Sequence, residues 1–281
     1  MANKRNAELH SARLRFQSVL LPTSFMKSRS CLPLLALCAT LGFLPAPAMA
    51  DTLPDPATKN KVPPLPYVQA MIWDRLKLAD FTLTGTVKFD NNKKQYPITL
   101  RTKGHEMVYE FQGQPLQIRV QLNPGVFIVQ KRTSPSAPWA DITGADMGKS
   151  ILDTDITYED LGIDFMNWDD IEPLGTDTIK TLDAYVFDAK PAPTDHSRFA
   201  TVRFWVSKDY WAFLRIDGLN AKGQTVKRVE VQDVMTVGDV HKFYVFKEMK
   251  VANMAADKDD IAKSTTYIDI IDGKEGSGLT Q

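Results

Sequence analysis

Apolar and polar residues alternate along much of this chain, and this alternation is the feature that most restricts its fold. Within 81–89, the odd positions are apolar or glycine and the even positions are threonine or lysine. Because successive side chains of a β-strand point to opposite faces, the pattern predicts a strand with one buried face. Such segments recur about every ten residues with turn residues between them, which is typical of an antiparallel meander.

The predicted strands form two runs, separated by a segment without alternation. The first run covers 81–89, 96–102, 106–111, 116–122 and 126–131, and the second covers 171–174, 176–190, 200–206, 212–219, 225–234, 242–249 and 265–270. Helical spacing of apolar residues predicts a helix of about three turns over Tyr67–Leu78. The apolar segment from Trp139 to Trp168 is what a cover over a sheet would require. We predict one domain with a curved antiparallel sheet of about ten strands.

The N-terminal region predicts export from the cytoplasm. Lys27 and Arg29 precede an apolar run, and Ala48-Met49-Ala50 supplies a small-residue cleavage site, so 26–50 is typical of a signal peptide. The apolar run is too short for a membrane span. Residues 1–25 form a doubtful N-terminal extension, 51–66 an extended, proline-rich leader and 67–281 the functional domain. A cleaved signal predicts a soluble, periplasmic protein.

Charge and cysteine content exclude several classes of partner. Both cysteines, Cys31 and Cys38, lie in the predicted signal, so no disulfide is expected in the mature chain. After Ala50 there are 28 basic and 33 acidic residues, a net charge of −5. Binding to nucleic acid needs clustered lysine and arginine, so no nucleic-acid partner is expected. We expect a monomer.

Few residues suggest catalysis or metal binding. His105, His196 and His241 are far apart in the sequence and do not have the spacing of a zinc site. Paired acids can cleave glycosides and clustered oxygens can bind calcium, but acids near turns usually cap backbone amides. We expect no catalytic residue, no metal and no cofactor. The most distant alternative is an exported hydrolase that uses the carboxylates from Asp153 to Asp170, which are Asp153, Asp155, Asp160, Asp164, Asp169 and Asp170.

The apolar faces of the predicted elements supply the candidate ligand-binding residues. A β-sandwich core would explain these faces, and so would an apolar concavity in a half-open sheet, because a lipid site needs apolar area rather than reactive groups. Composition does not separate the two. The candidates are Trp73, Phe81, Leu83, Val87, Ile98, Leu100, Phe127, Val129, Phe204, Leu214 and Ile216.

One segment resembles a known family. Asp153-Thr154-Asp155-Ile156-Thr157-Tyr158-Glu159-Asp160-Leu161 resembles the D-x-S-Y-E-D-L stretch of the LolA/LolB-like outer-membrane lipoprotein-sorting proteins, with Thr157 in place of the serine. Residues 201–211, which end in Lys208-Asp209-Tyr210-Trp211, and 215–217 with Gly223-Gln224 resemble later strands of that family. The likeness covers roughly 67–271 and is weakest before Trp139.

The resemblance implies an unclosed half-barrel of about ten or eleven antiparallel strands, with an N-terminal helix and a central helical or loop cover over an apolar cavity. The cavity would take lipoprotein acyl chains or lipid, delivered by an inner-membrane transporter and received by an outer-membrane receptor. A cleaved signal favours a LolA-like shuttle over a LolB-like anchored receptor. An alternative with the same fold is an envelope-stress module that binds a membrane-anchored regulator. Arg101 and Arg119 lie in no matching motif, so the family's latching arginine is not assigned here.

Overall fold

One antiparallel sheet of thirteen strands organises the residues that the computed structural model describes, which are 56–76, 78–89, 91, 93–238, 243–256, 258 and 260–279. These residues belong to one compact unit, Ala48–Gln281. The predicted N-terminal extension, the predicted signal and His241 lie outside the described residues. The strands are β1 (Leu78–Phe89), β2 (Lys94–Gly104), β3 (Glu106–Phe111), β4 (Gln117–Asn123), β5 (Val126–Arg132), β6 (Ala140–Asp141), β7 (Asp170–Ile179), β8 (Leu182–Lys190), β9 (Thr201–Ser207), β10 (Phe213–Leu219), β11 (Thr225–Val237), β12 (Phe243–Met254) and β13 (Ala262–Glu275).

The chain enters and leaves the sheet at its centre. The strand order is β6-β5-β4-β3-β2-β1-β13-β12-β11-β10-β9-β8-β7, so the first strand pairs with the last. From β1 the chain runs outward to the edge strand β6, crosses to the opposite edge at β7 and returns inward by hairpins. Strands β6 and β7 are not paired with each other, which leaves the sheet unclosed. The crossing segment, 142–169, therefore joins the two edges and is called the cover here.

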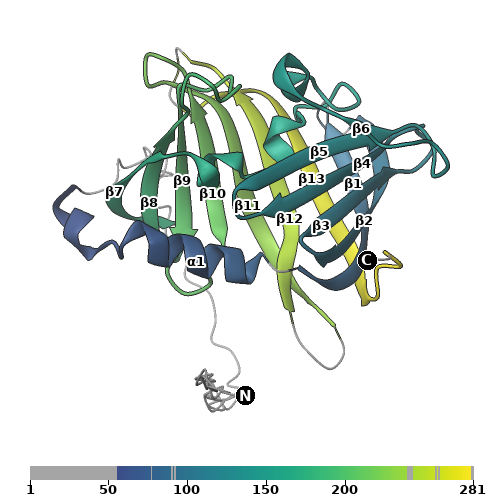
Figure 1. Ribbon diagram of the computed structural model, residues 1–281, viewed down its shortest axis with the longest axis horizontal. Helices are drawn as coiled ribbons and strands as arrows, with labels where there is room; N and C mark the ends of the chain where they lie inside the picture. The colour runs from purple at the N-terminus through teal and green to yellow at the C-terminus, as the bar shows by residue number, and fades with distance from the viewer. Residues whose placement is uncertain are drawn as a thin grey trace, which may run out of the picture. The chain divides into compact units, whose positions relative to one another are not determined.

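The sheet curls so that strands of the first run come round in front of β12 and β13 (Figure 1). Bulges in several strands assist the curling, because an extra residue bends a strand and increases its twist. At one of them, between Thr84 and Gly85, β1 shifts register against β13. A Cβ atom at Gly85 would lie 2.1 Å from the main-chain oxygen of Asp269, so only glycine allows the two backbones to approach this closely.

Few helical turns accompany the sheet. Helix α1 (Leu65–Arg75) has a proline in its first turn, where the missing N–H leaves no hydrogen bond unmade, and it buries Val68 and Ile72 one turn apart. The side-chain amide of Gln69 donates to the main-chain oxygen of Met166 at 3.0 Å, which ties α1 to the cover. The other helices are short 3₁₀ turns, η1 (Pro56–Lys61), η2 (Gly144–Gly148), η3 (Glu159–Leu161) and η4 (Asp164–Asn167).

The core lies on the concave face, between the curled sheet, α1 and the cover. Its largest fully buried side chains include Phe187 and Phe204 of neighbouring strands, whose rings stack with centroids 5.2 Å apart. A smaller apolar cluster of Ala184, Val186, Trp205 and Leu214 alternates with the main core along β8 and β9, so it lies on the convex face. The concave face of the sheet therefore carries the main apolar core, and the convex face carries a much smaller apolar cluster.

The predicted architecture is confirmed, with differences in detail. The structure has thirteen strands where about ten or eleven were predicted, and α1 ends at Arg75 rather than at Leu78, where β1 already begins. The prediction of one strand over 176–190 is wrong, because β7 turns into β8 after Ile179. The turn uses Lys180 with φ of 55°, a conformation more typical of glycine or asparagine, whereas the nearby Gly175 lies in a bulge of β7. The proline-rich leader, predicted to be extended, contains the 3₁₀ turn η1.

Replacing Gly85 with valine should destabilise the junction between the first and the last strand. The new side chain must displace the backbone of β13, and such overpacking costs about 1–3 kcal/mol. Urea unfolding of G85V should show this loss, whereas T84A, at an exposed neighbouring position, should change stability by less than about 0.5 kcal/mol. An unchanged midpoint for G85V would mean that the close approach at this bulge is not required.

Candidate functional site

A cavity of about 560 Å³ lies between the two arms of the curled sheet, which are β1 to β6 and β7 to β13. Its walls come from β5 and β6 on the first arm and from β9, β10 and β11 on the second. The cover and the loop that joins β8 to β9 complete them. The volume lies within the range of about 300–1,000 Å³ that small-molecule sites occupy. The apolar concavity that the sequence left open as one of two possibilities is therefore present.

Apolar side chains form the inner walls. Aromatic rings of the cover and of β9 meet there, because Phe165 of η4 lies 5.0 Å from Phe204 and 6.5 Å from Trp168 between ring centroids. Only a hydrogen atom fits at two wall positions, since a Cβ at Gly162 would overlap the ring of Phe127 and one at Gly218 the ring of Phe199. The apolar lining residues are Phe127, Ile128, Val129, Ile142, Met147, Phe165, Trp168, Phe199, Val202, Ile216 and Val229.

Polar and charged side chains gather where the cavity meets solvent. Asp141, Thr143, Asp164, Thr194 and His196 line the cavity and are exposed. They come from β6, from the cover that follows it and from the β8–β9 loop, so the opening lies where these segments meet. A guest with an apolar body and a polar end would fit this arrangement.

The structure divides the eleven residues that the sequence nominated for ligand binding. Phe127, Val129 and Ile216 line the cavity, and Phe204 packs directly behind its wall. Leu214 lies on the convex face, because a bulge between Phe213 and Arg215 shifts the alternation by one residue. The remaining six pack within the concave core without lining the cavity, and they are Trp73, Phe81, Leu83, Val87, Ile98 and Leu100.

Sequence reasoning missed the lining residues that the cover and its neighbours supply. Ile142, Met147, Phe165 and Trp168 belong to a segment without any periodic pattern, so nothing in the alternation assigned them to a face. Their apolar character within a polar, acid-rich stretch was the available signal.

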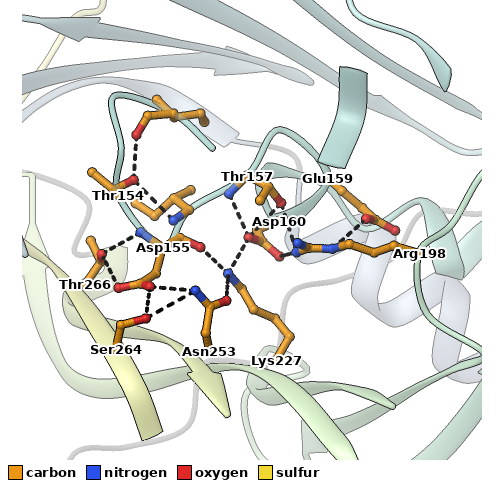
Figure 2. A network of polar contacts seen from close by, with 12 residues as sticks. Thr154, Asp155, Thr157, Glu159, Asp160, Arg198, Lys227, Asn253, Ser264 and Thr266 are labelled. Carbon is orange, nitrogen blue, oxygen red and sulfur yellow. Dashed lines mark hydrogen bonds and ion pairs between the residues drawn. The ribbon is translucent and has the colours of Figure 1, made fainter. Parts of the chain in front are cut away.

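Buried charges attach the cover to the sheet (Figure 2). Lys227 of β11 lies 2.9 Å from the carboxylate of Asp160 in η3, and both side chains are 3% exposed. The same ammonium group donates to the main-chain oxygen of Asp155 and, at 3.3 Å, to the side-chain oxygen of Asn253. Burial of a charge is costly unless it is paired and hydrogen-bonded, and Lys227 meets both conditions.

Asp155 is the second attachment point of the cover. Its carboxylate accepts hydrogen bonds from Asn253 of β12 at 2.6 Å, from Thr266 of β13 at 2.9 Å and from Ser264 of β13. Its main-chain N–H donates to the Thr266 hydroxyl at 2.9 Å. One aspartate thus binds the cover to the two strands beside the centre of the sheet.

Arg198 extends the network to the β8–β9 loop. Its guanidinium bonds Asp160 at 2.9 Å and Glu159 at 3.0 Å, while the Ser197 hydroxyl donates to Glu159 at 2.7 Å. Burial raises the pKa of the Glu159 carboxyl above its ordinary value, although the bonds from Ser197 and Arg198 act in the opposite direction. Both segments that border the opening are therefore joined by ion pairs.

The network explains the acid-rich segment and the family-like stretch within it. Asp155 and Asp160 are fully occupied in fastening the cover, and the carboxylate of Asp160 also accepts the main-chain N–H of Thr157 at 2.8 Å. Asp153, Asp169 and Asp170 are exposed. Within the described part of the chain, no group of three or more His, Cys, Asp or Glu side chains could hold a metal ion.

Removing the Lys227 ammonium should be strongly destabilising. K227M removes the buried cation from the Asp160 carboxylate, which then keeps only the partly exposed Arg198, so the loss should approach about 3–5 kcal/mol, the typical cost of breaking a buried pair. The double variant K227M/D160N should recover part of this loss, because no uncompensated charge remains. Chemical denaturation followed by circular dichroism measures both effects.

Lys149 provides the matched control. It pairs with Asp146 at 2.6 Å in the same cover segment, but both side chains are more than half exposed. K149M should leave the unfolding midpoint unchanged, as expected for an ion pair in solvent. Equal losses in K227M and K149M would show that the buried pair has no special role.

Comparison with known proteins identifies the fold. A family model described as an uncharacterized protein matches residues 137–271. A comparison with curated proteins found no match. Among solved structures, a putative outer-membrane lipoprotein-sorting protein domain from Vibrio parahaemolyticus is similar, with a TM-score of 0.62 and 13% identity over 78% of this chain and 96% of that one.

Two further structures agree with this result. A DUF1329 family protein from Desulfovibrio piger has a TM-score of 0.59 and 15% identity, and a LolA superfamily protein from Nitrosomonas europaea has a TM-score of 0.53 and 11% identity. Each match covers 78% of this chain and 96% of the other. The resemblance noted in the sequence is confirmed at the level of the fold, which is LolA-like. None of the helices among the described residues has the length and hydrophobicity to cross a membrane.

Proposed function

Since the chain has the LolA-like fold, we propose that it binds the acyl chains of a lipoprotein or of a lipid and carries them through the periplasm. The main support is the cavity of about 560 Å³, whose inner walls are apolar and whose opening is polar. A cavity of this kind shelters an apolar guest from water while its polar end stays outside. No bond chemistry is proposed.

Affinity would come from the burial of apolar surface. Each methylene group taken from water contributes about 0.8 kcal/mol, so a chain of a few carbons already binds appreciably. The ion pair of Lys227 with Asp160 and the hydrogen bonds of Asp155 attach the cover to β11, β12 and β13, so the walls are formed before the guest arrives. A preformed site avoids the cost of ordering its walls during binding.

Release would require a partner that offers the guest a better site. In this proposal an inner-membrane transporter loads the protein and an outer-membrane receptor unloads it. The predicted cleavable signal at 26–50 supports such a shuttle, because a chain from which this segment has been removed is not held at one membrane by it.

The direct test is to purify the exported protein from periplasm under native conditions and to analyse the bound material by mass spectrometry. A carrier should retain stoichiometric acyl-containing molecules. An empty protein that forms a tight complex with a membrane-anchored regulator would contradict the carrier and would favour a regulatory module with the same fold.

Filling the cavity should abolish binding without unfolding the protein. Val229 of β11 lines the cavity, so V229W places an indole in the space that a guest would use. We expect at least about tenfold weaker binding of a neutral fluorescent probe such as 1-N-phenylnaphthylamine, a loss of about 1.4 kcal/mol. The matched control is V234W on the same strand, where Val234 is 54% exposed and lines no part of the cavity. Equal binding by both variants would place the probe outside the cavity.

A further inference from the structure

The opening of the cavity carries an excess of negative charge. Asp141, Asp164 and Asp195 line it, and none of them lies within ion-pair distance of a cation in the described part of the chain. Their hydrogen-bond donors are neutral, since Gln130 donates to Asp141 at 2.7 Å, Asn167 to Asp164 at 3.3 Å, and the main-chain N–H of Ala192 to Asp195 at 2.8 Å. The two other acids of the lining, Glu159 and Asp160, are neutralised by Arg198 and Lys227.

Two of these carboxylates act on each other. Partial burial raises the pKa of the Asp164 carboxyl above its ordinary value, and the negative charge of Asp195 raises it further, whereas Asn167 and the indole N–H of Trp168 act in the opposite direction. Asp164 belongs to the cover and Asp195 to the β8–β9 loop, and both line the cavity, so two segments bring like charges to it. A cation between them would relieve the repulsion.

A buried hydrogen-bond donor lies beside the same acids. Trp168 lines the cavity and is 9% exposed, and its indole N–H has no hydrogen-bond acceptor among the described residues. It lies near the carboxyl of Asp164 without reaching the geometry of a hydrogen bond. A buried donor without an acceptor costs free energy, which an acceptor atom of a bound molecule would recover.

We propose that the guest is a cationic amphiphile, whose ammonium group lies between Asp164 and Asp195 and whose hydrocarbon chain fills the apolar part of the cavity. A carbonyl next to the ammonium group would accept the hydrogen bond from Trp168. This inference rests on the proposed function and adds the charge of the ligand to it. A metal ion fits less well, because the described residues offer no group of three ligating side chains here and a single pair of carboxylates rarely suffices.

The test measures displacement of 1-N-phenylnaphthylamine by amphiphiles of one chain length. Dodecyltrimethylammonium, dodecanol and dodecanoate carry a positive, no and a negative charge, and lauroylcholine adds a carbonyl beside the cation. The measurement is made below the critical micelle concentrations and at one fixed pH for all ligands. The cation should bind at least about tenfold more tightly than the anion, because each carboxylate within a few ångströms contributes to the preference. Lauroylcholine should bind more tightly still.

Substitutions test whether Asp164 and Asp195 cause the preference for the cation over the anion. D164N/D195N should reduce the ratio of cation to anion affinity to near one. The control is D153N, which removes a charge from an exposed position of the cover outside the cavity. It should retain the full ratio. Thermal unfolding of all variants confirms that each is folded.

The possible failures are distinguishable. If neither the probe nor any amphiphile binds, the proposed function itself is wrong. If dodecanol binds but the cation and the anion bind equally, or if D153N abolishes the preference as D164N/D195N does, the protein is an acyl-chain binder without the charge selectivity inferred here.

Discussion

The buried attachment of the cover to the sheet is the constraint on which the rest of the site depends. The ion pair between Lys227 and Asp160 and the hydrogen bonds of Asp155 connect the cover to three strands of one arm. Charges in a low-dielectric interior tolerate little displacement, because each lost partner leaves a costly unpaired group. The cover is therefore held at a defined height above the concave face, and the space beneath it remains open.

The topology explains why such an attachment is needed. Pairing of β1 with β13 places both ends of the sheet-forming chain at its centre, so the connection between β6 and β7 must span the whole concave face. A long irregular segment buries many backbone groups that need partners. Side chains of β11 and β13 supply partners for the backbone of Asp155, because Lys227 donates to its main-chain oxygen and the Thr266 hydroxyl accepts from its N–H. The cover attached in this way gives the cavity an apolar interior with an acidic opening.

Much of the fold was predictable from the sequence, because alternation reports directly which strand faces are buried. The bounds of β3 were predicted to the residue, and the order of helix, strands, cover and strands was confirmed. The errors have local causes. The turn at Lys180 lacks the usual turn residues, and the bulge before Arg215 moves Leu214 to the convex face. A bulge leaves no clear mark in a pattern with a period of two.

By itself the sequence determined an antiparallel sheet, a cover between two runs of strands, a predicted export signal and a resemblance that proved correct for the fold. Only the tertiary structure decided where the cavity lies and what lines it. Phe127, Val129 and Ile216 were predicted, but Phe165, Trp168 and the acids of the opening came from segments without periodicity. The physical reason is that alternation records burial along one strand, whereas this cavity forms where strands, cover and loop meet through side chains far apart in the sequence.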